Sequence, residues 1–235
     1  MTDGEPDVSV PAQALGEPAR ARMVVALLGD RSIPAGELAR EAEVTPSTAS
    51  EHLRVLLEAG LVRVSQHGRR RLYRLASADV SRAVEALQAI APRGEVTSLR
   101  AHRASRELHA GRTCYDHLAG DLGLRVSDLL ITAGVLTVLQ VGDSVDPPDP
   151  FPTGDVMDAL GVVPPSGRRP WARGCLDWTG RRAHVAGQVG THVLRSMEAR
   201  NWIQRRPESR AVQLTPAGAE ALARLRSTAP SDMPR

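Results

Sequence analysis

The sequence predicts a mainly α-helical fold with small β-hairpin wings: a winged helix-turn-helix followed by a degenerate tandem of winged-helix-like units. Three observations support this prediction. Aromatic residues make up only 3% of the 235 residues, so Leu, Val and Ala must build the core, which favours helices over a β-sandwich. The first third of the chain shows helix, helix, turn, helix and hairpin patterns in that order. The second half contains an internal repeat.

The first module is expected over residues 17–92, after a disordered lead over residues 1–16. Apolar residues at helical spacing predict one helix from Pro18 to Leu28 and a short second helix from Pro34 to Ala42. Thr45 then caps a third helix that ends at Gly60. The last two helices have the lengths and spacing of a helix-turn-helix.

A hairpin and a closing helix complete this module. Leu61–Ser65 alternates between apolar and polar residues as a strand does, Gln66–Arg69 is a turn, and Arg70–Leu75 is the returning strand. Residues 79–90 are again helical in pattern. This order of elements is that of a winged helix, in which the hairpin is the wing.

Residues 93–226 are expected to form the second part of the molecule, a sensory or oligomerisation region, and residues 227–235 a disordered tail. After a basic helix over residues 97–109, the run His-Leu-Ala-Gly at residues 117–120 recurs as His-Val-Ala-Gly at residues 184–187. The copies are expected over residues 113–162 and 175–226. Each is expected to run helix, turn, helix, strands, helix, with the Pro-rich segment 143–152 as an elaborated wing.

The third helix has the two faces that a DNA-recognition helix needs. Ala49, Leu53, Leu56 and Leu57 form an apolar face, and short polar residues lie opposite, which lets such a helix enter the major groove, about 12 Å wide. The DNA contacts expected from this helix are Thr45, Ser47, Thr48, Ser50, Glu51, His52 and Arg54.

The wing is the second expected DNA contact, because Arg at a hairpin tip can enter the minor groove. The contacts expected from it are Gln66, His67, Arg69, Arg70 and Arg71. A solvated surface is the alternative interpretation of such an Arg cluster. All 30 basic residues of the chain are Arg, which hydrogen-bonds phosphate and guanine with two nitrogens, but the net charge of +3 only permits a polyanionic partner.

Three runs carry a resemblance to a known family: Leu-Ala-Arg-Glu-Ala at residues 38–42, Ser-Thr-Ala-Ser-Glu-His-Leu at 47–53, and Leu-Glu-Ala-Gly-Leu-Val at 57–62. Over residues 17–87 the chain resembles the ArsR/SmtB regulators. The resemblance implies a homodimeric repressor that binds double-stranded DNA at an inverted repeat in a promoter and is released by an inducer. The first helix of the reading pair lacks the Cys-x-Cys motif of many metal-sensing members, so their usual metal site cannot be transferred.

The candidate effector residues lie beside the two repeated motifs, and each set contains Cys-x-Asp. They are Cys114, Asp116, His117, Cys175, Asp177 and His184. If the copies pack with pseudo-symmetry, two Cys with His or Asp would suit zinc or another soft metal ion. The cysteines could instead form a redox switch, or simply pack as small buried side chains beside capping Asp residues. An organic inducer near Trp171, Trp178 or Trp202 is a further alternative.

Other classes of protein find little support in the sequence. No P-loop, Gly-x-Gly-x-x-Gly, His-Glu-x-x-His or Ser-centred elbow is present, so we expect no enzyme. No run approaches the roughly 20 apolar residues of a membrane span. Two cysteines do not make a disulfide framework, so the chain is expected to be cytoplasmic, nucleoid-associated and reduced. A winged helix that binds proteins without reading DNA remains the alternative function.

Overall fold

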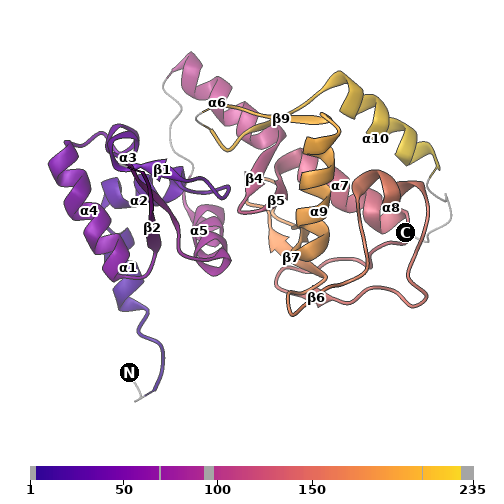
Figure 1. The fold of residues 1–235 in the computed structure, drawn as a ribbon, viewed down its shortest axis with the longest axis horizontal. Helices are drawn as coiled ribbons and strands as arrows, with labels where there is room; N and C mark the ends of the chain where they lie inside the picture. Colours follow the sequence, from indigo (N-terminus) through magenta and orange to yellow (C-terminus); the bar gives the residue numbers. More distant parts are fainter. Residues whose placement is uncertain (1–3, 69, 93–97, 208, 229–235) are drawn as a thin grey trace. The chain divides into compact units, whose positions relative to one another are not determined.

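The structure, a computed structural model, describes residues 4–68, 70–92, 98–207 and 209–228 and divides into two compact units (Figure 1). The first unit ends at Val84 and the second begins at Glu85. The division therefore falls inside a helix, whereas the sequence places the boundary after residue 92. Each unit has its own apolar core.

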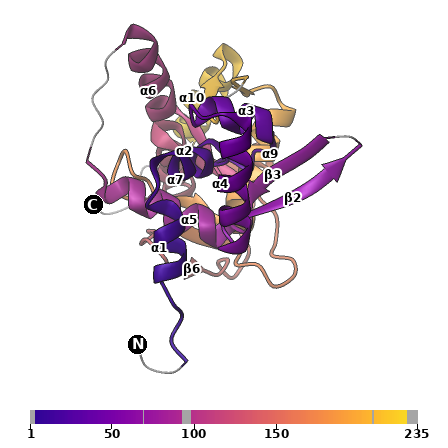
Figure 2. The ribbon, with the colours of Figure 1, turned by 90° about the vertical axis from the view of Figure 1, so that its left-hand side faces the viewer.

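The first unit has the order of elements predicted for a winged helix. Its elements are α1 (Ser9–Leu15), α2 (Pro18–Ala26), β1 (Ile33–Pro34), α3 (Ala35–Glu41), α4 (Pro46–Glu58), β2 (Val62–His67), β3 (Arg70–Leu75) and α5 (Ala78–Ile90), which spans the division. The three strands form one antiparallel sheet in the order β1-β3-β2. Figure 2 shows the β2–β3 hairpin extending beyond the helices of this unit. The predicted winged helix-turn-helix is confirmed.

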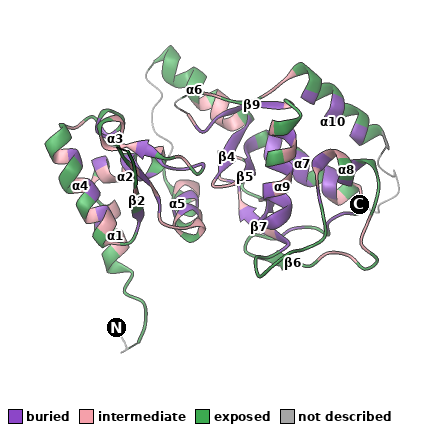
Figure 3. Ribbon diagram, viewed as in Figure 1, coloured by how far each residue is buried: buried purple, intermediate pink, exposed green. Residues whose placement is uncertain are grey.

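The core of this unit explains why α4 is held in a fixed orientation. Ala49, Leu53 and Leu56 of α4 are at most 1% exposed and pack in one cluster with Leu38 of α3 and Met23 of α2. The opposite face of α4 is open to solvent (Figure 3). Burial of one face thus fixes which side chains the helix presents outward.

The disordered lead predicted for residues 1–16 is wrong over residues 9–15, because α1 forms there. Ala14 is 3% exposed and belongs to the same core as Ala19. The guanidinium of Arg20 also donates to the carbonyl oxygen of Gln13 at 3.0 Å, near the end of α1. Apolar burial and this contact order a segment whose acidic, polar composition suggested disorder. Residues 1–3 lie outside the described residues.

The second unit contains the remaining helices and three small sheets. Its elements are α6 (Leu99–Ala110), β4 (Arg112–Cys114), β5 (His117–Ala119), α7 (Gly120–Thr132), β6 (Ser144–Val145), α8 (Asp155–Leu160), β7 (Ala172–Leu176), β8 (Ala183–Ala186), α9 (Gly187–Ala199), β9 (Ile203–Arg205), β10 (Val212–Leu214) and α10 (Pro216–Thr228). The sheets are β4-β5, β6-β7-β8 and β9-β10, all antiparallel. The predicted start of α6 at Thr97 and most of the predicted tail lie outside the described residues.

The internal repeat is present in the structure, with one difference in the order of its elements. Each copy begins with a β-hairpin, β4–β5 or β7–β8, where the sequence suggests a helix and a turn. A long helix follows each hairpin, α7 in the first copy and α9 in the second. The segment at residues 143–152, expected as a wing, supplies β6, which pairs instead with β7 of the second hairpin.

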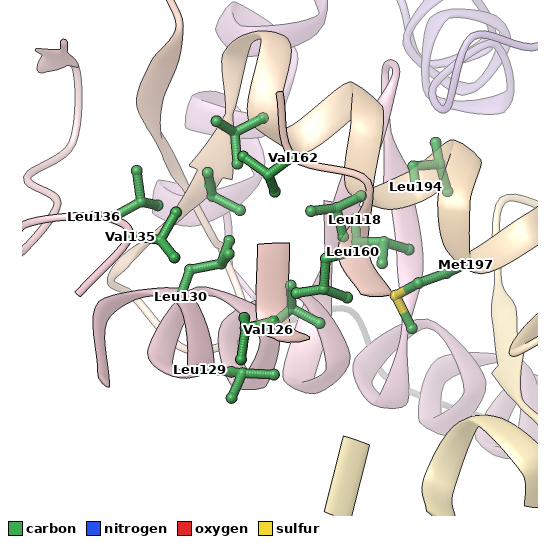
Figure 4. Packing of buried hydrophobic residues seen from close by; sticks show 14 of the residues in the cluster. Leu118, Val126, Leu129, Leu130, Val135, Leu136, Leu160, Val162, Leu194 and Met197 are labelled. Carbon is green, nitrogen blue, oxygen red and sulfur yellow. The ribbon is translucent and has the colours of Figure 1, made fainter. Parts of the chain in front are cut away.

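The two copies pack around a shared core. Helix α7 packs against β8 and α9 packs against β5, so each helix covers a strand of the other copy. Matching positions of the repeat, such as Val126 with Val193 and Leu130 with Met197, are at most 1% exposed in the same cluster. Figure 4 shows several of these side chains converging from different elements. Among the described residues, the helices are all too short or too polar to cross a membrane.

Candidate DNA interface and a buried cysteine and histidine cluster

Helix α4 begins with a well-formed cap. The Thr45 side chain accepts the backbone N–H of Thr48 at 3.2 Å, and Pro46 occupies the first helical position. The Thr45 hydroxyl also lies 2.9 Å from the hydroxyls of Ser47 and Thr48. These three hydroxyls therefore form a small network at the helix N-terminus, where the helix dipole favours an anion such as phosphate.

The outward face of α4 carries most of the residues predicted to contact DNA. Ser47, Ser50, Glu51 and Arg54 are exposed, and Arg54 forms an ion pair with Glu58 at 2.7 Å. His52 differs from the others because its Nε2 atom lies 3.6 Å from the Glu17 carboxylate, with the imidazole largely buried. The structure thus places His52 beside the helix α2 cap rather than in the exposed row.

The wing presents its predicted residues to solvent. Gln66, His67, Arg70 and Arg71 are exposed along β2 and β3, and His67 pairs with Arg70 next to the turn. The guanidinium of Arg71 lies 5.7 Å from the centroid of the Tyr73 ring. Arg69 lies outside the described residues. Arg63, a further exposed Arg on β2, was not predicted, although its position in the alternating pattern of the strand points outward.

The candidate effector residues come together at the two repeated hairpins of the second unit. Cys114 on β4 stands directly opposite His117 on β5, and Cys175 on β7 stands directly opposite His184 on β8. The repeat therefore produces the same cross-strand Cys–His pair twice.

The two pairs face each other. The Sγ atoms of the two cysteines are 3.9 Å apart, and the Nε2 atoms of the two histidines are 3.1 Å apart. One nitrogen or sulfur atom from each of the four residues lies within 4.8 Å of the other three. All four residues are at most 5% exposed. We call Cys114, His117, Cys175 and His184 the Cys/His cluster.

The two aspartates of the predicted set lie behind the histidines. An Asp116 oxygen is 3.4 Å from His117 Nδ1, and the same carboxylate accepts two hydrogen bonds from Arg169, at 2.6 and 3.0 Å. An Asp177 oxygen is 3.7 Å from His184 Nδ1, and it accepts hydrogen bonds from Arg112 at 3.1 Å and from the backbone N–H of Gly120 at 2.6 Å. Each histidine thus has a carboxylate beside the ring nitrogen that faces away from the cluster.

The electrostatics of the cluster differ between its members. The Cys175 thiol and burial raise the pKa of Cys114 well above its ordinary value. Burial lowers the pKa of His117, but the neighbouring Cys114 and Asp116 outweigh it and raise that pKa to about 9. Burial and repulsion from His117 lower the pKa of His184 well below its ordinary value. A protonated His117 can therefore donate to a neutral His184 across the 3.1 Å contact.

Burial is the largest single effect on both aspartates and raises their pKa, but several hydrogen bonds and charges together outweigh it and lower the pKa. Hydrogen bonds and charges from His117 and Arg169 hold the pKa of Asp116 well below its usual range. The charge of Arg112 and the hydrogen bonds from Thr179, Gly180 and Gly120 do the same for Asp177. Both carboxylates are therefore ionised at neutral pH, as partners of the histidines must be.

The three tryptophans of the second unit have different surroundings. Trp171 is 2% exposed and donates its indole N–H to the carbonyl of Val163 at 3.0 Å. The Trp178 ring lies 4.4 Å from the guanidinium of Arg112. Trp202 borders a hollow of about 300 Å³ between α8 and α10. The Cys/His residues therefore lie together, whereas the three tryptophans each have separate neighbours.

Comparisons with known proteins support the assignment of the first unit as a helix-turn-helix domain, and one relative is similar over both units. Residues 15–65 match a family model described as a helix-turn-helix domain. The HTH-type transcriptional regulator YdfF of Bacillus subtilis is 38% identical over 216 residues, which cover 91% of this chain and 94% of that protein. This similarity therefore includes both units.

Shorter regulators match a smaller share of the chain. The HTH-type transcriptional regulator CmtR of Mycobacterium tuberculosis is 40% identical over 72 residues, or 31% of this chain and 60% of CmtR. An NMR structure described as the cadmium metal-sensor CmtR of that organism covers 39% of this chain and 94% of its own, with 33% identity and a TM-score of 0.33. The long match to YdfF, together with the family runs in α3 and α4, identifies the chain as a winged helix-turn-helix transcriptional regulator of the ArsR/SmtB family.

Proposed function

We propose that the chain is a homodimeric repressor that binds an inverted repeat in a promoter and leaves it when an effector binds the second unit. The observation that carries the DNA part of this proposal is the outward face of α4. Its exposed residues are mostly short, with Glu51 and Arg54 further along the helix, its N-terminus is capped and free of carboxylates in the first turn, and an Arg-bearing wing belongs to the same unit. These are the requirements for entry into a major groove.

Exposed apolar residues support the dimer. Leu87 and Ile90 on α5 are 47% and 78% exposed, and Val8, just before α1, is 74% exposed. Exposed large apolar side chains of this kind favour burial against a second copy. Sedimentation equilibrium of the purified full chain is expected to give twice the mass of one chain. A monomer at micromolar concentration would contradict this part of the proposal.

DNA reading is tested with the DNA fragment upstream of the protein's own gene. The full chain is expected to shift this fragment in a gel, to bind it more tightly than random DNA, and to lose affinity as salt increases. Absence of a shift at low salt, or equal affinity for random DNA, would contradict the proposal. That result would favour the winged helix as a protein-binding module.

A matched pair of variants assigns DNA binding to α4. In Ser47→Glu a negative charge replaces a hydroxyl in the first turn of the helix, where it suits the helix dipole and preserves folding but repels phosphate. The expected loss of affinity is about 10-fold or more, because a single repulsion of about 1.4 kcal/mol lowers a binding constant tenfold. Ser227→Glu on α10 is the control and should leave affinity unchanged. Equal affinity of both variants would exclude α4 as the reading helix.

A further inference from the structure

The Cys/His cluster needs an explanation that the DNA-binding function does not supply. Its cysteines pack with Ala119 and Ala186 as small buried side chains, which simple packing would explain. Packing does not explain two buried imidazoles whose Nε2 atoms face each other at 3.1 Å. Nor does it explain the Nδ1 atom of His184, which is buried without a hydrogen-bond partner among the described residues. Buried polar atoms normally have such partners.

The distances within the cluster match those between the ligands of a tetrahedral zinc ion. Bond lengths of about 2.3 Å to sulfur and about 2.05 Å to nitrogen place two sulfurs about 3.8 Å apart and two nitrogens about 3.3 Å apart. The measured separations are 3.9 Å for the sulfurs and 3.1 Å for the nitrogens. Two thiolates and two imidazoles are a common ligand set for structural zinc.

The charge of such a centre also suits a buried site. On binding a divalent cation the two thiols lose one proton each, and any imidazolium loses its extra proton, so that four lone pairs face the ion. A dication with two thiolates and two neutral imidazoles has no net charge. The centre therefore avoids the large cost of an unpaired charge in the protein interior.

The aspartates complete the arrangement. With Nε2 bound to a metal, a neutral imidazole carries its proton on Nδ1, and this proton faces Asp116 in His117 and Asp177 in His184. Carboxylates in this position orient metal-binding histidines and make them stronger ligands. The orphaned Nδ1 of His184 would then gain Asp177 as a partner after a small movement from the present 3.7 Å.

We propose that Cys114, His117, Cys175 and His184 bind one divalent metal ion of the zinc class per chain, with Asp116 and Asp177 as positioning residues. All four ligands are buried, so the centre is closed and has a structural or regulatory role. The ion links the two copies of the repeat, since each copy supplies one Cys and one His. This inference does not depend on DNA binding, and either can fail while the other stands.

The test uses the untagged full chain and two metal probes, zinc and cobalt. Elemental analysis after dialysis is expected to find one zinc per chain. Cobalt is expected to give the visible absorption of a tetrahedral site and a thiolate-to-cobalt band in the near ultraviolet. Each of the variants Cys114→Ser, Cys175→Ser, His117→Gln and His184→Gln is expected to lower zinc affinity at least 100-fold. His102→Gln, at an exposed His on α6, is the control and should bind zinc normally.

If the ligand variants misfold, the unmodified chain provides a second test of zinc binding. Zinc is expected to protect both thiols from a thiol reagent and to raise the thermal midpoint of the chain, and a strong chelator to reverse both effects. Asp116→Asn is expected to lower zinc affinity 10- to 100-fold. The control is Asp128→Asn, which removes a half-exposed ion pair. Without metal, the two variants are expected to have similar thermal midpoints. Fewer than 0.2 zinc per chain with no effect of chelator would overturn the proposal. A cobalt spectrum without the thiolate band, or isolation with a disulfide between Cys114 and Cys175, would overturn it as well.

Discussion

Arg112 shows how a single residue holds the cluster in place. Its side chain is fully buried, and its guanidinium donates to the Asp177 carboxylate, lies 3.7 Å from Glu85, and faces the ring of Trp178. A further N–H donates to the carbonyl of Leu108 at 3.2 Å. Asp177 in turn lies behind His184. The position of one ring nitrogen of the cluster thus depends on a charge network centred on Arg112.

Replacing Arg112 by Met is therefore expected to destabilise the second unit by about 3–5 kcal/mol, because two buried carboxylates lose their shared cation. Denaturant unfolding of the full chain measures this loss. Arg182→Met removes an ion pair with Asp128 that is half exposed, and it should cost less than about 1 kcal/mol. Similar losses in both variants would show that the Arg112 network contributes no more than a surface ion pair.

The sequence gives no sign of this role. Arg112 follows a run of basic residues, but α6 ends at Ala110 and Arg112 opens a buried strand. Its acidic partner Asp177 is 65 residues away in the chain. Ion pairs between distant residues leave no periodic pattern, whereas the Thr45 cap and the buried face of α4 arise from neighbours within a few residues and can be predicted.

At the scale of elements, two glycines allow each repeated helix to begin against a neighbouring backbone. Gly120 and Gly187 open α7 and α9 with φ values of +74° and +80°. A Cβ atom on Gly120 would lie 2.6 Å from the carbonyl oxygen of His109, and one on Gly187 would lie 2.8 Å from that of Pro170. Both distances are too short for a real contact, so the Gly of His-x-Ala-Gly is required by close packing.

Gly187→Ala is expected to destabilise the second unit by more than about 2 kcal/mol, because it adds a backbone clash to the cost of roughly 1–2 kcal/mol for a left-handed non-Gly residue. Gly134→Ala is the matched control, since Gly134 has φ of +69° and nothing near its missing Cβ. It should show the conformational cost alone. The difference between the two free energies of unfolding measures the clash, and a difference near zero would contradict the close approach.

The hairpins of the repeat could not be predicted for a related reason. Strands β4 and β5 are three residues long, and all six residues are buried. Such strands lack the alternation of apolar and polar residues that indicates a strand, and the long helices that follow them dominate the pattern. The repeat itself is evident in the sequence, and the structure brings one Cys and one His from each copy together.

At the scale of the whole molecule, the two units have separate apolar cores, so we expect two unfolding transitions. Leu53→Ala removes a 1% exposed side chain from the first core and should shift only one transition, by about 2–5 kcal/mol. Met197→Ala in the second core should shift only the other by a similar amount. Circular dichroism during denaturant titration resolves the two. A single transition that both variants shift equally would show that the units unfold together.

The cross-strand Cys–His pairs have a consequence for the ancestry of the second unit. A gene encoding one copy of the hairpin and helix would supply only two ligands, so its product would have to associate with itself to complete a set of four. Duplication and fusion place both halves in one polypeptide, at a high effective concentration fixed by the fold. Assembly of the ligand set then no longer depends on the concentration of the protein.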